Sequence, residues 1–279
     1  MKSQEGYVLI ITVLTIAALA ISFGVANRSF FLSAGRDREQ ETKDEIERIV
    51  EAIKGNPNVK TFGYIGDMGR LPNTLSELNT QGSQPAFHND DSGTTHFMSV
   101  KMGWNGIYVP GVYQDSYLED AWGNDYTYTI GTVAVDHDNN AGTATVNWRR
   151  AQIKSNGPDQ TASTDDDISS EYMWESGALY FSPRKADDFP NIPGWADINL
   201  YSATNGEQTL TTIDGSQDKI SFTDGEGNTF QVLPASTISH GPHATELMRS
   251  GEGAGKKNQQ GVFNCQGGVL KLIIIFIPD

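Results

Sequence analysis

The feature that most constrains this chain is an uncharged run near its N-terminus. Tyr7–Ala26 (YVLIITVLTIAALAISFGVA) follows a six-residue start, MKSQEG. Because a helix rises about 1.5 Å per residue, a helical run of this length is about 30 Å long, the thickness of a bilayer core. We therefore predict that residues 7–26 form a transmembrane helix.

The helical pattern continues beyond the uncharged run. In ETKDEIERIVEAIK, four apolar residues recur at the spacing of one helical face: Ile46, Ile49, Val50 and Ile53. A Gly-Asn-Pro sequence at 55–57 is a typical helix end. The pattern predicts one helix over 7–54, with a transmembrane half and an amphipathic half that packs on the rest of the chain.

Composition narrows the function classes. A formal net charge of −15 and a pI of about 4.6 argue against nucleic-acid binding, because phosphates would be repelled, but they suit a divalent cation. The single cysteine, Cys265, excludes an intramolecular disulfide and a cysteine-based zinc site. After residue 55, many turn-forming residues and little helical periodicity favour β structure.

The six-residue start has two interpretations. The uncharged run is longer than an ordinary secretory h-region, so it fits an uncleaved signal anchor. Alternatively, the start is a leader that is cut between Gly6 and Tyr7, which leaves an aromatic residue at the new N-terminus.

The second arrangement resembles the leader of type IV pilins and type II secretion pseudopilins. That resemblance implies cleavage after Gly6 and N-methylation of Tyr7. Most members carry Glu at the fifth residue after the cut, where this chain has Ile11. In the family this carboxylate is thought to pair with a neighbouring subunit's N-terminal amine, so its absence favours a minor or tip subunit.

Three downstream blocks extend the resemblance to the major pseudopilins over residues 1–170. They are IGDMGRLPNTLSELNTQ (65–81), DAWGNDYTYTI (120–130) and SNGPDQTASTDDDI (155–168). In the first, Gly69 and Pro72 indicate a turn. In the second, Tyr126 and Tyr128 alternate as in a strand with one buried face.

The third block contains a candidate calcium loop. The resemblance implies that it binds Ca²⁺, with Asp159 and Asp166 as the best ligands, Asp167 next, and Asp165 nearby. Independently, four carboxylates within nine residues would repel one another without a cation, and Ca²⁺ takes six to eight oxygen ligands. The family's loop glycines are replaced by Gln160 and Ser163. A solvated acidic loop without metal is the alternative.

Other candidate sites have simpler interpretations. Asp136–Gly142 partly matches an EF-hand opening, but a β-hairpin loop explains it as well. The aromatic residues Trp104, Tyr108, Tyr113 and Tyr117 suit a sugar-binding platform, although aromatic residues covering a small sheet are commoner. The sequence contains no nucleophile-and-base motif of the kind that indicates an enzyme.

The C-terminal hundred residues read as an appended all-β module with a hairpin turn at 224–228. The final apolar run, 269–277, is too short to cross a membrane and predicts a central buried strand. The domain prediction is a leader (1–6), an N-terminal helix (7–54), a pseudopilin-like globular domain (55–171) and a C-terminal β domain (172–279).

Together these features predict an α+β fold, with the long N-terminal helix on a small antiparallel sheet, a calcium loop and an all-β C-terminal domain. The expected function is a non-catalytic subunit of a pilus-like or pseudopilus filament. Its expected partners are copies of itself, other pilin-like subunits, the prepilin peptidase, the assembly platform and the membrane. The expected location is the bacterial inner membrane, as a single-pass protein, then a periplasmic or extracellular filament. The alternative is an anchored binding protein whose C-terminal β domain recognises a glycan or protein.

Overall fold

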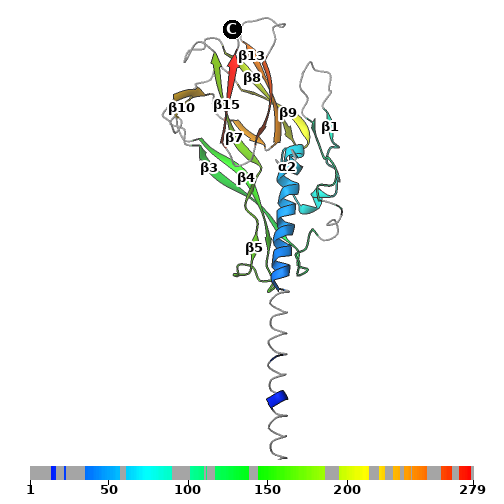
Figure 1. Cartoon of the computed structure of the whole chain (residues 1–279). Helices are drawn as coiled ribbons and strands as arrows, with labels where there is room; N and C mark the ends of the chain where they lie inside the picture. Colours follow the sequence, from blue (N-terminus) through cyan, green and yellow to red (C-terminus); the bar gives the residue numbers. More distant parts are fainter. Residues whose placement is uncertain are drawn as a thin grey trace, which may run out of the picture.

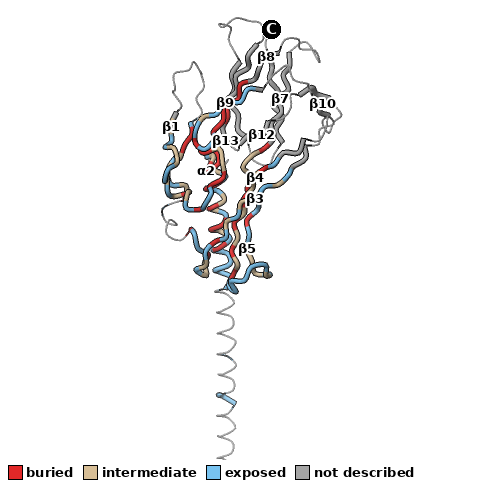
Figure 2. Tube along the Cα trace, turned by 180° about the vertical axis from the view of Figure 1, so that it is seen from behind, coloured by how far each residue is buried: buried red, intermediate tan, exposed pale blue. Residues whose placement is uncertain are grey.

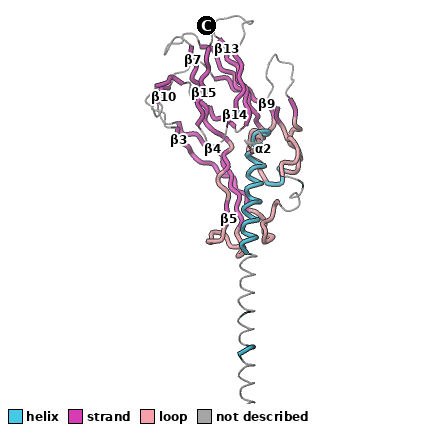
Figure 3. The backbone as a smooth tube through the Cα atoms, in the orientation of Figure 1, coloured by secondary structure: helices cyan, strands magenta, loops and turns pink. Residues whose placement is uncertain are grey.

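The computed structural model describes residues 14–16, 22, 35–56, 61–89, 101–109, 111, 117–137, 144–185, 195–213, 220–223, 229–232, 236–239, 241–249, 259–265 and 270–277. Strands predominate among them (Figure 3). Continuous helix covers 35–54, and two short helices follow, α2 (Gly63–Met68) and the 3₁₀ helix η1 (Leu75–Leu78).

The predicted fold class, with one long N-terminal helix that is half transmembrane, is wrong. Of residues 7–34, only 14–16 and 22 are described, and continuous helix is found only over 35–54. That helix is amphipathic, because it has charged side chains on its exposed face and apolar side chains on its buried face. Within the part of the chain that the structure describes, no helix combines the length and apolar composition needed to cross a bilayer. The predicted single-pass inner-membrane location depended on such a helix and is corrected with it.

The first sheet is built on a long antiparallel hairpin, β3 (Thr127–His137) and β4 (Ala144–Ser155), which pair from Thr127–Lys154 to His137–Ala144. This pairing confirms the predicted hairpin around the second acidic turn. Two short strands, β5 (Ile168–Ser169) and β6 (Met173–Trp174), also pair with β4.

Helix 35–54 packs against this sheet, and the main core lies between them (Figures 1 and 2). Ile46, Ile49 and Ile53 of the apolar stripe are buried, as their spacing predicted. They meet the leucines of the 65–81 block and the inward residues of the sheet. The cluster also includes Tyr64, Ile65, Met68, Leu71, Leu75, Leu78, Tyr126, Ala151, Ile153 and Met173.

The C-terminal strands form two further sheets and a hairpin. The four-stranded antiparallel sheet has the order β14 (Gln259–Cys265), β13 (Gly241–Arg249), β8 (Trp195–Thr204), β9 (Glu207–Ile213). The three-stranded sheet has the order β12 (Ser236–Ser239), β7 (Ser176–Lys185), β15 (Leu270–Ile277). The strands β10 (Ile220–Thr223) and β11 (Thr229–Val232) pair as the predicted hairpin.

The last strand does not occupy the predicted central position. Among the described strands, β15 pairs only with β7, in parallel, and lies at the edge of its sheet. A β-branched apolar run indicates a strand but carries no information on its neighbours, because edge and central strands share that composition.

The β8–β9 hairpin packs directly on the segment that follows helix 35–54. Gly206 N–H donates to the carbonyl of Met68 at 2.8 Å, and the strand β2 (Lys101–Met102), which pairs with β1 (His88–Asn89), lies on the same segment. Met102, Tyr201 and Ala203 form a second buried cluster at this junction. The predicted domain boundary at 171/172 falls between β5 and β6, two strands that pair with the same partner.

Candidate functional site

The acidic loop joins β4 to β5 at the level where helix 35–54 begins (Figure 1). Both ends of the loop are fixed, because Ser155 pairs with Ile168 and Lys154 with Ser169. Gln160 and Ser163 have φ angles of 58° and 69°, in the left-handed region that favours glycine. These are the two positions where the resembled family has glycine, so the loop adopts a glycine-like backbone with other residues.

The loop brings two of the predicted ligands together. The Thr164 hydroxyl lies 2.8 Å from Asp166 Oδ1 and 3.4 Å from Asp159 Oδ1. The Asp159 amide also donates to Asp166 Oδ2 at 3.4 Å, while Asp159 Oδ1 accepts the Thr161 amide at 2.8 Å. The two carboxylates therefore converge on one hydroxyl.

The other two aspartates are not part of this pair. Asp167 Oδ2 accepts the Ser163 amide at 2.7 Å and forms an ion pair with Lys154. The hydrogen bond from Lys154 is the main cause that lowers the pKa of Asp167 below its usual value. Asp165 is exposed. Among the described residues, no three His, Cys, Asp or Glu side chains gather closely enough to hold a metal ion.

Asp120, which the sequence did not indicate as a site residue, links the acidic loop to the DAWGN block through hydrogen bonds. Its side chain is 5% exposed. Its Oδ1 accepts the amides of Trp122 and Asn124, and its Oδ2 accepts the Ser155 hydroxyl at 2.6 Å. Ser155 Oγ in turn accepts the Gly157 amide at 3.0 Å. The DAWGN block and the acidic loop thus share one buried carboxylate.

Helix 35–54 is bound to the same block. The Thr42 hydroxyl accepts the Ala121 amide at 3.2 Å, and the Tyr126 hydroxyl donates to Glu45 Oε2 at 3.0 Å. Burial raises the pKa of Glu45, despite the hydrogen bond from Tyr126. The acidic loop, the DAWGN turn and helix 35–54 are therefore connected by one network of hydrogen bonds at the edge of the core.

The 65–81 block has its own half-buried carboxylate, Glu77. Glu77 Oε2 accepts hydrogen bonds from Tyr64 at 2.5 Å and from Arg70 at 2.9 Å, and Asn73 donates to both oxygens of the carboxylate. Burial opposes ionisation of Glu77, but these donors outweigh it and lower its pKa. The interactions hold the turn after Gly69 in place.

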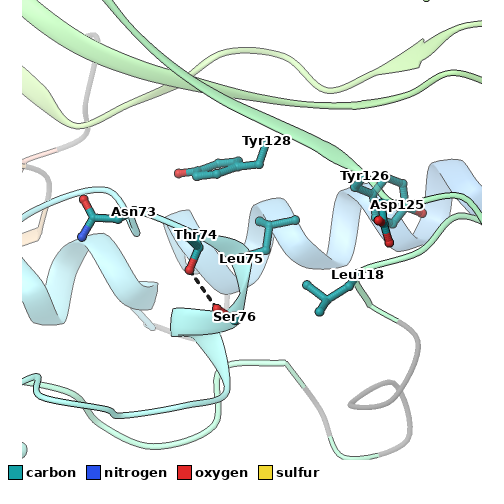
Figure 4. A pocket seen from close by; sticks show the side chains of 8 residues that line it. All are labelled: Asn73, Thr74, Leu75, Ser76, Leu118, Asp125, Tyr126 and Tyr128. Atoms are coloured by element: carbon teal, nitrogen blue, oxygen red, sulfur yellow. Dashed lines mark hydrogen bonds between the residues drawn. The ribbon is translucent and has the colours of Figure 1, made fainter.

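An open pocket of about 400 Å³ lies between this block and the first sheet (Figure 4). Eight residues line it: Asn73, Thr74, Leu75, Ser76, Leu118, Asp125, Tyr126 and Tyr128. Most of its polar groups are engaged within the protein. Tyr128 donates to the Pro72 carbonyl, Tyr126 donates to Glu45, and the hydroxyls of Thr74 and Ser76 bond to each other. This arrangement stabilises the fold and offers little chemistry to a ligand.

The aromatic residues considered for a sugar platform cover the core. Tyr117 is buried, and Trp104 and Tyr108 pack against the main cluster. Trp104 donates to the Glu77 carbonyl and Tyr108 to Asp67 Oδ2. Tyr113 lies outside the described residues, as do 138–142 of the second acidic turn and the processing residues Gly6 and Tyr7.

Comparison with known proteins adds no family. No protein-family model matches this chain, and no curated protein matches it. The resemblance to pilin-like subunits therefore depends on the leader and the three sequence blocks.

Proposed function

We propose that the chain is a structural subunit of a type IV pilus-like or type II secretion pseudopilus filament, stabilised by calcium. The observation that carries the proposal is the order of the leader and three blocks, 65–81, 120–130 and 155–168, along the sequence. Its proposed partners are further copies of the chain, other pilin-like subunits, the prepilin peptidase and the assembly platform. The role is mechanical, and no catalytic step is assigned to the chain.

Contacts among the blocks support this proposal. Asp120 of the second block bonds to Ser155 of the third, and Thr42 and Glu45 of helix 35–54 bond to the second block. The first block supplies leucines to the same core. Segments that resemble one family in sequence are therefore also neighbours in space, as expected when they specify one shared unit.

Calcium is the cofactor that we propose for the loop. Asp159 and Asp166 supply carboxylate oxygens close to the Thr164 hydroxyl, and loop carbonyls would complete the six to eight oxygens that Ca²⁺ takes. The backbone fits this role, because Gln160 and Ser163 hold the glycine-like conformations. Asp167 is a weaker candidate, because Lys154 already neutralises it. A bound cation would remove the repulsion between the two converging carboxylates.

Filament formation tests the proposal. Material sheared from cells that produce the full-length chain should contain helical filaments that bind an antibody against the chain. Gly6→Val, which alters the residue before the proposed cut, should abolish these filaments while leaving the chain present in the cells. Ser3→Ala in the same leader is the matched control and should leave them unchanged. Monomeric chain in all three preparations would count against the proposal.

A further inference from the structure

The outer face of the first sheet carries a cluster of aromatic residues around one arginine. Ala151, Ile153 and Met173 point into the core. Side chains alternate along a strand, so Arg150 of β4 and Trp174 of β6, which pair directly, point to the opposite face. Tyr172, just before β6, joins them and is 43% exposed.

Arg150 is held in place by these rings. Its guanidinium carbon lies 3.6 Å from the centroid of the Tyr172 ring and 5.5 Å from that of Trp174. Trp174 in turn meets the buried Trp148 edge to face, with centroids 5.9 Å apart. A guanidinium stacked on an aromatic ring is partly ordered before any ligand arrives, which lowers the entropic cost of binding.

Arg150 differs from its neighbours in having no acidic partner among the described residues. Arg149 pairs with Glu175, and Lys154 pairs with Asp167. The chain has 35 acidic and 20 basic side chains, so carboxylates are plentiful. Even so, none of the described carboxylates pairs with this half-buried arginine. Because no described carboxylate pairs with it, the guanidinium edge can form a bidentate hydrogen bond to a carboxylate.

There is open space beside this arginine. Gly131 of β3 lies directly opposite Arg150, so a side chain there would project on the same face. A Cβ built at Gly131 meets no atom within 4 Å. The guanidinium is therefore bordered by aromatic rings on one side and by an empty position on the other.

We propose that Arg150, Tyr172 and Trp174 bind an acidic sugar of the uronate class. Arg150 would take the sugar carboxylate, and the exposed aromatic surface would contact the C–H face of the pyranose ring. The cluster is small, whereas a stable protein interface covers about 800 Å² on each partner, so a single sugar unit fits it better than a folded protein. This site is independent of the proposed filament function.

Binding of D-glucuronate to the full-length chain, kept in mild detergent because of its apolar N-terminal run, tests the site. Saturation-transfer NMR should give a dissociation constant for glucuronate at least tenfold lower than for D-glucose. Arg150→Lys, which keeps the charge but loses the planar fork, should weaken glucuronate binding at least tenfold. Gly131→Val, which fills the open position, should do the same. Arg36→Lys, on exposed helical surface, should change nothing.

Circular dichroism should show all variants to be folded, so that lost binding reports on the site. Equal affinity for glucuronate and glucose would overturn the proposal, as would full binding by both site variants. If the wild-type chain does not bind glucuronate, and Arg150→Lys instead changes its sedimentation, the arginine meets a protein carboxylate and the sugar proposal is wrong.

Discussion

At the scale of single residues, the carboxylates in or beside the core differ in how many hydrogen bonds they accept. Asp120 and Glu77 each accept several hydrogen bonds. Asp67, at 9% exposure, accepts hydrogen bonds from Tyr108, at 3.0 Å, and from Asn105, but burial outweighs them and raises its pKa to about 6. An acid whose folded pKa is raised destabilises the folded state once it is ionised.

Asp67 therefore predicts a pH dependence of stability. Its folded pKa lies above the value of about 3.9 expected in an unfolded chain, so the folded state holds the proton more tightly. Between these two values the contribution of Asp67 to the free energy of unfolding should fall as pH rises, by about 3 kcal/mol in all, and this contribution should be level above pH 7. Asp67→Asn should remove this contribution, which leaves the fall due to Glu45, whose pKa burial also raises, and should be the more stable protein at pH 8. Urea unfolding from pH 4 to 8 measures both.

Tyr108→Phe is the matched variant for this prediction. Loss of the hydroxyl donor should raise the pKa of Asp67 further, so the fall in stability should extend to higher pH than in the wild type. A pH profile that is the same in the wild type, Asp67→Asn and Tyr108→Phe would show that Asp67 does not control it.

The calcium loop gives a second prediction at this scale. Excess Ca²⁺ should raise the thermal midpoint of the wild-type chain, because a ligand present at a hundred times its Kd stabilises the folded state by about 2.7 kcal/mol. Asp166→Asn should lose this response, since Asp166 converges with Asp159. Asp165→Asn, at the adjacent exposed position, is the control and should keep it. Thermal unfolding with calcium or with chelator decides, and a full response in Asp166→Asn would rule out this ligand.

At the scale of elements, the β8–β9 hairpin packs against α2 through a glycine. Gly69 has a φ of 69°, and a Cβ there would lie 1.8 Å from the Ala203 carbonyl oxygen. Gly82 has a similar φ of 55°, but a Cβ there meets nothing within 4 Å. A comparison of the two positions therefore distinguishes the cost of backbone strain from the cost of displacing the hairpin.

Alanine at each position should show the difference. Gly82→Ala should cost about 1 to 2 kcal/mol, the strain of a left-handed residue. Gly69→Ala should cost about 3 to 5 kcal/mol, because the added methyl group must also displace the hairpin. Denaturant unfolding of the two variants measures these costs. Equal losses would mean that the hairpin does not need this close contact.

Local elements could be predicted from the sequence where a pattern is short-range. The stripe of Ile46, Ile49 and Ile53 has a helical period and is buried. Tyr126 and Tyr128 alternate and lie on β3 or directly before it, against the core. The edge position of β15 and its parallel pairing with β7 could not be predicted, because strand pairing depends on distant segments that local composition does not identify.

The candidate site was predictable only in part for the same reason. The sequence placed Asp167 next after Asp159 and Asp166 as a ligand, but Lys154 on the paired strand forms an ion pair with Asp167, which a local motif does not reveal. Asp120 and the Arg150 cluster are built by residues from separate strands and turns, and no single motif contains them. The DAWGN block was the one signal that pointed toward Asp120.

At the scale of the whole molecule, the C-terminal strands and the 65–81 block share a buried junction. Backbone hydrogen bonds join Gly206 to Met68 and Gly103 to Asp67, and Tyr201 and Met102 are buried together. The composition of the last hundred residues predicted strands but not this docking. A filament subunit built this way would present its C-terminal sheets on a base formed by the three family-like blocks.

The mature N-terminus is the most direct test of the proposed function. Mass spectrometry of the chain purified from its native host should show Tyr7 as the first residue, carrying an N-methyl group, with residues 1–6 removed. That result would identify a prepilin-type leader in spite of Ile11. An intact Met1, or a first residue beyond Ala26, would contradict the account that the chain is a pilin-like filament subunit.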